Sequence, residues 1–440
     1  KVQLEVISAN AEDETSKRIT IVRNTIKLEE QAAQAKIIEI NQPQAFGLTP
    51  VSNNKNETPM RIGVIEIPTF YVDFKAQQQG VEDFRSTTRD VRRLINQLRE
   101  EGIEGLIIDL RSNGGGSLQE ADSMTGLFVG PGPTVQVKAA RRKANVYRSR
   151  INQVAWGGPL AVMVNRLSAS ASEIFAGAIQ DYERGVVIGS QTFGKGTVQT
   201  LIPLNRGQLK LTAAKFYRIS GESTQHQGVT PDVTFPTLVD ATQIGESTLD
   251  DAMPWDMIKP AAFTPIDGIS ANIVALRQRH EQRAENNPHF DYYQALRERS
   301  KENSQRQYLS LNEGTRRAEK SADEDWRLAL ENRLRVATNK LPAGNLEELE
   351  AFVEAETKTS ADKPAADDAI NAETEEAAEQ SVTAATDIVE LVDDDPLLQE
   401  AGNIVADLVI MRLGKQSGPE YASGPEPSLP SSIATAPSEG

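Results

Sequence analysis

Three short segments carry residue types that could support hydrolysis or phosphate binding. The first, Asp109–Gly116, reads DLRSNGGG and follows an apolar run. Three consecutive glycines permit a tight turn with exposed backbone N–H groups, which suits an oxyanion or a phosphate. An ordinary strand-to-helix turn has the same composition. Taken alone, this segment indicates a candidate anion site without naming a reaction.

The second segment is Ser168–Glu173, SASASE, between an expected strand and an expected helix. The first turn of a helix has unpaired N–H groups with partial positive charge. If Ser170 is a nucleophile, the N–H of Ala171 lies beside it as an oxyanion donor. The alternative is a plain helix cap made by Ser170 or Ser172, with Glu173 in the first turn. This segment alone favours the cap.

The third segment is Gly189–Thr197, GSQTFGKGT, which nearly matches the phosphate-binding pattern G-x-x-x-x-G-K-[ST]. Gly196 stands where a hydroxyl would hold Mg²⁺. The following residues, TVQTLIPL, have a β pattern, whereas a phosphate-binding loop opens a helix. Nucleotide binding is therefore disfavoured. Lys195 is then either a solvated loop lysine or a lysine placed in a tight, partly apolar setting.

A serine nucleophile needs a base, and the three segments together suggest a hydrolase. The chain has three histidines: His280 and His289 lie in a helical region, and His226 lies in a polar loop without a supporting motif. Lys195 can act instead if an apolar setting favours its neutral amine. Gln199, four residues further along a β segment, lies on the same face and could orient that amine.

Each candidate segment follows a predicted strand of one region, residues 60–236. Alternating short apolar runs and amphipathic runs predict an α/β domain there. We expect helices at 87–101, 117–128 and 171–181. We expect strands at 61–67, 105–110, 134–137, 160–164, 186–189 and 208–219.

The flanking regions have other compositions. Residues 1–40, with β segments at 2–7 and 18–23, are interpreted as the end of a preceding domain and a linker. Residues 237–415 are predicted to form a mainly helical domain, from helical spacing at 270–285, 290–306, 315–337 and 396–413. We expect an acidic flexible segment near 354–395 and a disordered tail at 416–440.

Charge and composition exclude several classes of function. The net charge is −16, and the segment from Leu341 to Glu400 holds 18 Asp or Glu residues against two Lys. The remainder is close to neutral and offers no basic stripe for nucleic acid. Cysteine is absent, which excludes a cysteine nucleophile, disulfides and Cys–zinc sites. No apolar run is long enough to span a membrane. Because Lys1 opens a strand-like pattern without an initiator Met, we expect that a secretion signal has been removed.

A family resemblance rests on five segments that cover nearly all of residues 60–236. They are DLRSNGGG (109–116), NRLSASASEIFAGAIQDY (165–182), GSQTFGKGTVQ (189–199), LKLTAAKFYRISGES (209–223) and GVTPDV (228–233). In this order they resemble the carboxyl-terminal processing peptidases, or tail-specific proteases, of family S41. The resemblance implies a serine endopeptidase with an α/β (α+β) core of mixed sheet and helices, with crotonase/ClpP-like ββα units, followed by a mainly helical C-terminal domain.

The resemblance also assigns roles by position. The nucleophile falls on Ser170, and the general base falls on Lys195, 25 residues later. The glutamine that orients the base falls on Gln199. Asp181 matches an aspartate that the family requires, with a role that is either catalytic or structural. The oxyanion donors fall on the N–H groups of Gly116 and Ala171. No metal and no other cofactor is implied.

The flanks extend the resemblance to the larger tail-specific proteases of Gram-negative bacteria. Residues 1–30 resemble the last strands of a PDZ-like domain, and 308–319 and 395–408 resemble the C-terminal part. The resemblance implies protein or peptide substrates with apolar C-termini, a periplasmic location at most peripheral to the inner membrane, room for a lipoprotein adaptor, and no nucleic-acid partner. The alternatives are a non-catalytic peptide-binding scaffold of the same fold and a P-loop-like nucleotide binder.

Overall fold

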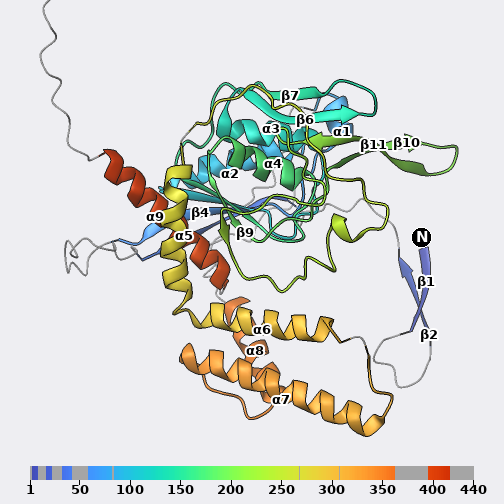
Figure 1. Cartoon of the computed structure of the whole chain (residues 1–440), viewed down its shortest axis with the longest axis vertical. Coiled ribbons are helices and arrows are strands. Elements are labelled where there is room, and N and C mark those ends of the chain that lie inside the picture. Colours follow the sequence, from blue (N-terminus) through green and yellow to red (C-terminus); the bar gives the residue numbers. More distant parts are fainter. Residues whose placement is uncertain are drawn as a thin grey trace, which may run out of the picture.

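The structure is a computed structural model, and its described residues form an α/β core, a group of helices below it and a separate two-stranded ribbon (Figure 1). The described residues are 2–7, 16–21, 32–41, 58–81, 84–266, 268–306, 308–361 and 395–416. No helix among them is both long and apolar enough to cross a membrane.

The core is built on a six-stranded sheet with the order β12-β9-β8-β5-β4-β3. All neighbouring strands are parallel except β3 and β4, which are antiparallel. β5, β8 and β9 are buried along their whole length and are largely apolar, as expected for parallel strands covered on both faces. The strand bounds are β3 (Gln34–Ile40), β4 (Met60–Glu66), β5 (Gly105–Asp109), β8 (Leu160–Val164), β9 (Val186–Gly189) and β12 (Val233–Thr234).

Helices cover both faces of this sheet and produce two hydrophobic cores. One core packs α2 (Thr87–Glu100), α3 (Leu118–Val129) and α4 (Ala171–Asp181) against the sheet. The other contains residues of α5 (Ser270–Ala284) and α9 (Pro396–Gln416). Successive residues of a strand alternate between the two cores, so that Ile108 faces the first and Ile107 the second. The sheet and its helices therefore form a three-layer unit.

A second, antiparallel sheet has the order β10-β11-β6-β7. Its strands are β6 (Gly132–Ala139), β7 (Asn145–Ser149), β10 (Thr197–Pro203) and β11 (Gln208–Tyr217). The β10–β11 hairpin extends away from the core in Figure 1. Its outer half exposes apolar side chains, including Leu201 and Leu211. The hairpin begins two residues after Lys195, so it adjoins one of the candidate segments.

The remaining helices lie mostly below the core, connected to it through α5 (Figure 1). They are α6 (Pro288–Ser304), α7 (Glu313–Ala337) and α8 (Leu346–Ala361), and the short α1 (Phe74–Gln78) and 3-10 helix η2 (Glu246–Thr248) belong to the core region. Asn287 and Asn312 cap α6 and α7 by accepting hydrogen bonds from the first-turn N–H groups. The ribbon of β1 (Val2–Ile7) and β2 (Ser16–Ile21) stands apart from the rest.

Three features differ from the sequence-based expectations. Residues 34–40, assigned to a linker, form β3 and pair with β4, because their alternating apolar side chains complete both cores. Residues 354–361, expected to be flexible, lie in α8. β7 was not predicted, because NVYRS is short and polar. The acidic residues 362–394 and the tail 417–440 lie outside the described residues.

Candidate active site

Two of the candidate segments meet because they follow neighbouring parallel strands. β5 pairs with β8, with Asp109 opposite Met163, so the turns after both strands leave the same edge of the sheet. Asn113 connects the two turns. Its backbone carbonyl accepts hydrogen bonds from Ala169 N–H (3.0 Å) and Ser172 Oγ–H (2.9 Å). Ser168 Oγ donates to the carbonyl of Leu110 at 2.8 Å. DLRSNGGG and SASASE therefore form one interlocked unit.

Ser170 stands at the N-terminus of α4 with a backbone conformation that non-glycine residues rarely adopt. Its φ is 57° and its ψ is −109°. Such a backbone costs on the order of 1–3 kcal/mol and persists only where surrounding contacts hold it. A strained serine on a sharp strand-to-helix turn is the arrangement that exposes a nucleophilic hydroxyl in hydrolases. An ordinary helix cap does not need this strained backbone, so the structure distinguishes Ser170 from such a cap. The sequence alone could not make this distinction.

The glycines of DLRSNGGG lie directly against Ser170. A Cβ placed on Gly115 would lie 2.9 Å from Ser170 Cβ and 3.1 Å from Ala171 N. Gly115 and Gly116 have φ values of 106° and 143°, which favour glycine. Within the described part of the chain, the N–H groups of Gly116 and Ala171 have no hydrogen-bond acceptor. Two free donors therefore flank the Ser170 turn, as an oxyanion site requires.

Glu173 connects the Ser170 turn to the Lys195 loop. This side chain is fully buried, and its carboxylate accepts four hydrogen bonds. Oε2 accepts from Ser170 N–H (2.7 Å) and Lys195 N–H (2.9 Å), while Oε1 accepts from Gly194 N–H (2.7 Å) and Thr192 Oγ–H (2.6 Å). Burial raises the pKa of Glu173 to about 7. The four hydrogen bonds act in the opposite direction and lower this pKa, but the effect of burial is larger.

Sequence reasoning assigned Glu173 only to the first turn of a helix. The spacing Ser170-x-x-Glu173 is that of a capping box, in which the acid reaches back to the backbone N–H of the serine. That signal predicts the contact to Ser170. It does not predict the contact to Lys195, because the distant loop is brought there by the tertiary fold.

Lys195 is half-buried in a loop whose N–H groups are already used. Gly194 and Lys195 donate to Glu173, and Gly196 donates to Gln225 Oε1 at 2.9 Å. A phosphate would need these donors free, and the next element is the strand β10 rather than a helix. The loop thus lacks the features of a nucleotide site. Among the described residues, the side-chain nitrogen of Lys195 has no hydrogen-bond or ion-pair partner.

Among the described residues, neither Gln199 nor Asp181 makes a hydrogen bond to Ser170 or to the side chain of Lys195. Gln199 is in β10, pairs with Thr212 and has an exposed side chain. Asp181 ends α4, roughly 16 Å along the helix from Ser170 at about 1.5 Å per residue. Its buried carboxylate pairs with Arg218, which follows β11. The structure therefore brings Asp181 to a structural ion pair and not to Ser170.

None of the three histidines contacts Ser170 in the described structure. His226 Nε2 donates to the carbonyl of Met253 at 2.7 Å. His280 is buried and lies 3.0 Å from Glu400 through Nδ1. His289 is in the first turn of α6.

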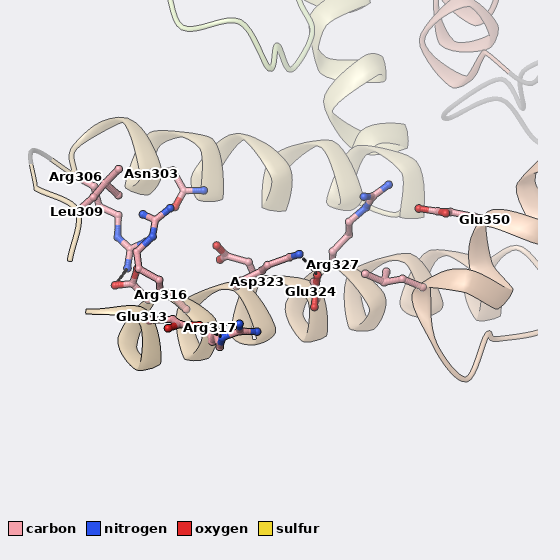
Figure 2. Close-up of a pocket in the computed structure, with 13 residues that line it drawn as sticks. Asn303, Arg306, Leu309, Glu313, Arg316, Arg317, Asp323, Glu324, Arg327 and Glu350 are labelled. Atoms are coloured by element: carbon pink, nitrogen blue, oxygen red, sulfur yellow. Dashed lines mark hydrogen bonds and ion pairs between the residues drawn. The ribbon is translucent and has the colours of Figure 1, made fainter. Parts of the chain in front are cut away.

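A groove between α6 and α7 lies apart from these residues. Figure 2 shows its lining side chains, which are mostly charged and include Arg316, Asp323 and Arg327. Acids and bases that line it pair with one another, as Arg306 does with Glu319. The groove contains none of the candidate residues.

Comparisons with known proteins identify two regions of the chain by sequence. Residues 61–235 match the model of Peptidase family S41, so this region of the chain belongs to that family. Residues 239–410 match the model of the C-terminal domain of tail specific protease, which identifies the tail-specific type within the family.

Named proteins are similar to parts of the chain. The chain is 39% identical over 343 residues to the tail-specific protease of Haemophilus influenzae, covering 74% of this chain and 44% of that protein. It is 40% identical over 159 residues to the carboxy-terminal-processing protease of Bartonella bacilliformis, covering 36% of each. The chain thus spans less than half the length of these relatives. A solved photosystem II D1 C-terminal processing protease has a TM-score of 0.39 and 27% identity, covering 55% of this chain and 57% of that one.

Proposed function

We propose that the chain is a serine endopeptidase of the tail-specific type that uses Ser170 as nucleophile and Lys195 as general base. The observation that carries the proposal is the Glu173 carboxylate, which binds the backbone of both residues at once. The strained backbone of Ser170 and the two free N–H groups beside it support the same reading.

The proposed reaction follows from these groups. Lys195 takes the hydroxyl proton of Ser170 as Oγ attacks the scissile carbonyl. The N–H groups of Gly116 and Ala171 stabilise the resulting oxyanion. Lys195 then protonates the leaving amine, and an ester on Ser170 remains. Water, deprotonated by Lys195, attacks the ester carbonyl; the C–Oγ bond breaks, Lys195 returns the proton to Ser170 Oγ, and the peptide acid leaves. Gln199 would orient the Lys195 amine once substrate is present, and Asp181 would support α4.

The substrate class and location are part of the proposal. We propose protein substrates that are processed at their C-termini, because the matched relatives are named for tail-specific and carboxy-terminal processing. That these C-termini are apolar is part of the proposal. The β1–β2 ribbon would be the end of a PDZ-like module that captures the substrate tail as an added strand. The protein would act in the periplasm and would be at most peripherally associated with the inner membrane. A lipoprotein adaptor would be a further partner in this proposal.

Casein cleavage and labelling by a fluorophosphonate test this function in Ser170→Ala, Lys195→Ala and His226→Ala. We expect the first two variants to lose cleavage and His226→Ala to retain it. Full activity in Lys195→Ala, or loss in His226→Ala alone, would contradict the proposed dyad. Absence of cleavage and labelling in the wild-type chain would instead favour a peptide-binding scaffold, and ATP binding at Lys195 would favour a nucleotide binder.

A further inference from the structure

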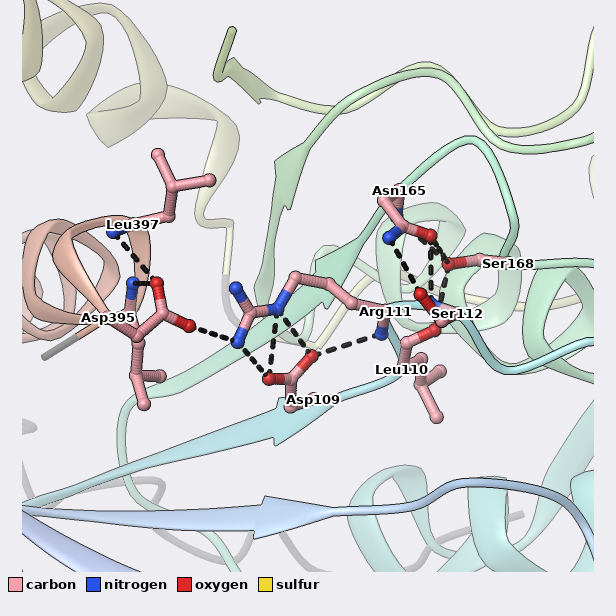
Figure 3. A network of polar contacts seen from close by, with 9 residues as sticks. Asp109, Leu110, Arg111, Ser112, Asn165, Ser168, Asp395 and Leu397 are labelled. Atoms are coloured by element: carbon pink, nitrogen blue, oxygen red, sulfur yellow. Dashed lines mark hydrogen bonds and ion pairs between the residues drawn. The ribbon is translucent and has the colours of Figure 1, made fainter. Parts of the chain in front are cut away.

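Arg111 joins the DLRSNGGG turn to the last helix of the described chain (Figure 3). Its Nε lies 3.0 Å from both carboxylate oxygens of Asp109, and its Nη2 lies 2.6 Å from Asp109 Oδ2. The same Nη2 lies 2.6 Å from Oδ2 of Asp395. One guanidinium thus holds the end of β5 and the start of α9 together.

Asp395 is fixed by its own helix. Its Oδ1 accepts hydrogen bonds from the N–H groups of Leu397 and Leu398 at 3.0 and 3.1 Å, so it caps α9. Its other oxygen, Oδ2, is the one that meets Arg111. One carboxylate oxygen of Asp395 therefore caps α9, and the other makes the ion pair with Arg111.

The rest of α9 has little freedom to move. Its apolar residues form much of the second core, and Val405 packs so closely on the sheet that a Cβ on Gly105 would lie 2.3 Å from it. Two buried acids on α9 also pair with α5: Glu400 with Arg283 and His280, and Asp407 with Arg279 and Arg283. Asp395 is thus presented to Arg111 from a rigid element.

The turn that follows Arg111 depends on contacts at both ends. Ser112 has a φ of 60°, and its N–H donates to Asn165 Oδ1 at 2.8 Å. The Asn113 side chain donates to the Ile67 carbonyl (2.7 Å) and accepts from Gly115 N–H (2.8 Å). This chain of contacts leads from Arg111 to the glycines that touch Ser170. A strained turn of this kind keeps its shape only while its contacts hold.

We propose that Asp395 is a positioning residue that acts through Arg111 to hold the turn carrying the Gly116 oxyanion donor. The inference rests on the proposed peptidase function of that turn. It makes α9 a part of the active-site scaffold, although Asp395 and most of α9 lie in the region matched by the C-terminal domain model.

The variant Asp395→Asn tests the proposal, because an asparagine Oδ1 still caps α9 while the ion pair to Arg111 is lost. Asp323→Asn is the matched control: it removes an acid paired with an arginine, Arg299, between α6 and α7. Two measurements on the full chain are needed: steady-state peptide cleavage, and hydrogen exchange of the backbone amides of residues 112–117.

We expect Asp395→Asn to lower kcat about tenfold with KM unchanged, since misplacing one oxyanion donor costs part of its effect on the transition state. We also expect faster exchange of residues 112–117 in this variant. Asp323→Asn should change neither. In an Arg111→Gln background, Asp395→Asn should have no further effect on kcat.

Unchanged exchange at residues 112–117 in Asp395→Asn would overturn the proposal whether or not the chain cleaves peptides. If Asp395→Asn shows faster exchange but has the same kcat as Asp323→Asn, the positioning role in catalysis is also overturned. A wild-type chain that neither cleaves peptide nor reacts at Ser170 would instead refute the proposed function. In that case the exchange measurement alone decides whether Asp395 holds the turn.

Discussion

Lys195 donates its backbone N–H to Oε2 of Glu173 at 2.9 Å. The same oxygen accepts the N–H of Ser170, so the proposed nucleophile and base are held through one buried atom. The contact explains how residues in different loops keep a fixed separation while the side-chain amine of Lys195 stays free of described partners.

Replacement of Glu173 by Gln should lower kcat/KM about a hundredfold. The amide nitrogen of glutamine cannot accept hydrogen bonds, so at least one backbone N–H loses its partner and the two loops shift, and a shift near 1 Å is enough for a loss of this size. Cleavage assays on folded variant protein measure the effect. Glu183→Gln, just beyond α4, is the control and should cleave normally. Normal cleavage by Glu173→Gln would show that the carboxylate does not position the pair.

Stability should depend on pH through Glu173. The pKa of its carboxyl is about 7 in the folded chain, against an ordinary value of 4.5, because burial disfavours the charged form. Between these two pKa values, the folded chain thus holds a proton that the unfolded chain has released. The contribution of Glu173 to the free energy of unfolding is therefore full below pH 4.5. It is lost as the pH rises through 7, by about 3 kcal/mol. Urea unfolding between pH 4 and 8 measures this slope, which Glu173→Gln should reduce. An equal slope in both proteins would contradict the assignment.

Gly115→Ala should abolish most activity, whereas Gly114→Ala should not. A Cβ at Gly115 would lie 2.8 Å from the Ala169 carbonyl oxygen and 2.9 Å from Ser170 Cβ, and the φ of 106° is unfavourable for alanine. A Cβ at Gly114 would meet no atom within 4 Å. We expect at least about a tenfold lower kcat for Gly115→Ala, from displacement of the oxyanion turn. Equal rates in the two variants would mean that the close approach of the turns is not needed.

Asp181→Ala should reduce stability far more than catalysis. The ion pair of Asp181 with Arg218 is largely buried, and removing one partner leaves the other charge buried alone. We expect a loss of about 3 kcal/mol in the free energy of unfolding. Urea unfolding measures this loss, and active-site titration with a fluorophosphonate counts the folded, reactive fraction. A kcat per titrated site that drops a hundredfold would give Asp181 a catalytic role instead.

Local patterns predicted much of the fold. The apolar runs at β5, β8 and β9 identify parallel strands, and the predicted helix at 171–181 matches the bounds of α4. The missed strand β3 lies beyond the predicted boundary of the core domain, and it is recognisable only by its pairing with β4. Periodicity describes one segment at a time and contains no information on which distant strand completes a sheet.

The candidate site was predictable to a similar degree. Ser170, Ala171 and the glycine turn follow neighbouring strands, which is a local property, and the structure brings them together. The links from Glu173 to Lys195 and from Asp395 to Arg111 join segments far apart in sequence. Residue type could not select either link: Glu173 binds a backbone N–H of Lys195, a group that nearly every residue has, and acid–base pairs such as Asp395 with Arg111 are common in any chain. The orienting role of Gln199 stays a proposal, and for Asp181 only the structural role is proposed.

Peptide mapping of the fluorophosphonate adduct tests the central claim most directly. The proposed dyad predicts one adduct on Ser170 in the wild-type chain and its near absence in Lys195→Ala, in which Ser170 is retained but its base is lost. An adduct on another residue, or equal labelling of Ser170 in Lys195→Ala, would contradict the pairing of Ser170 with Lys195.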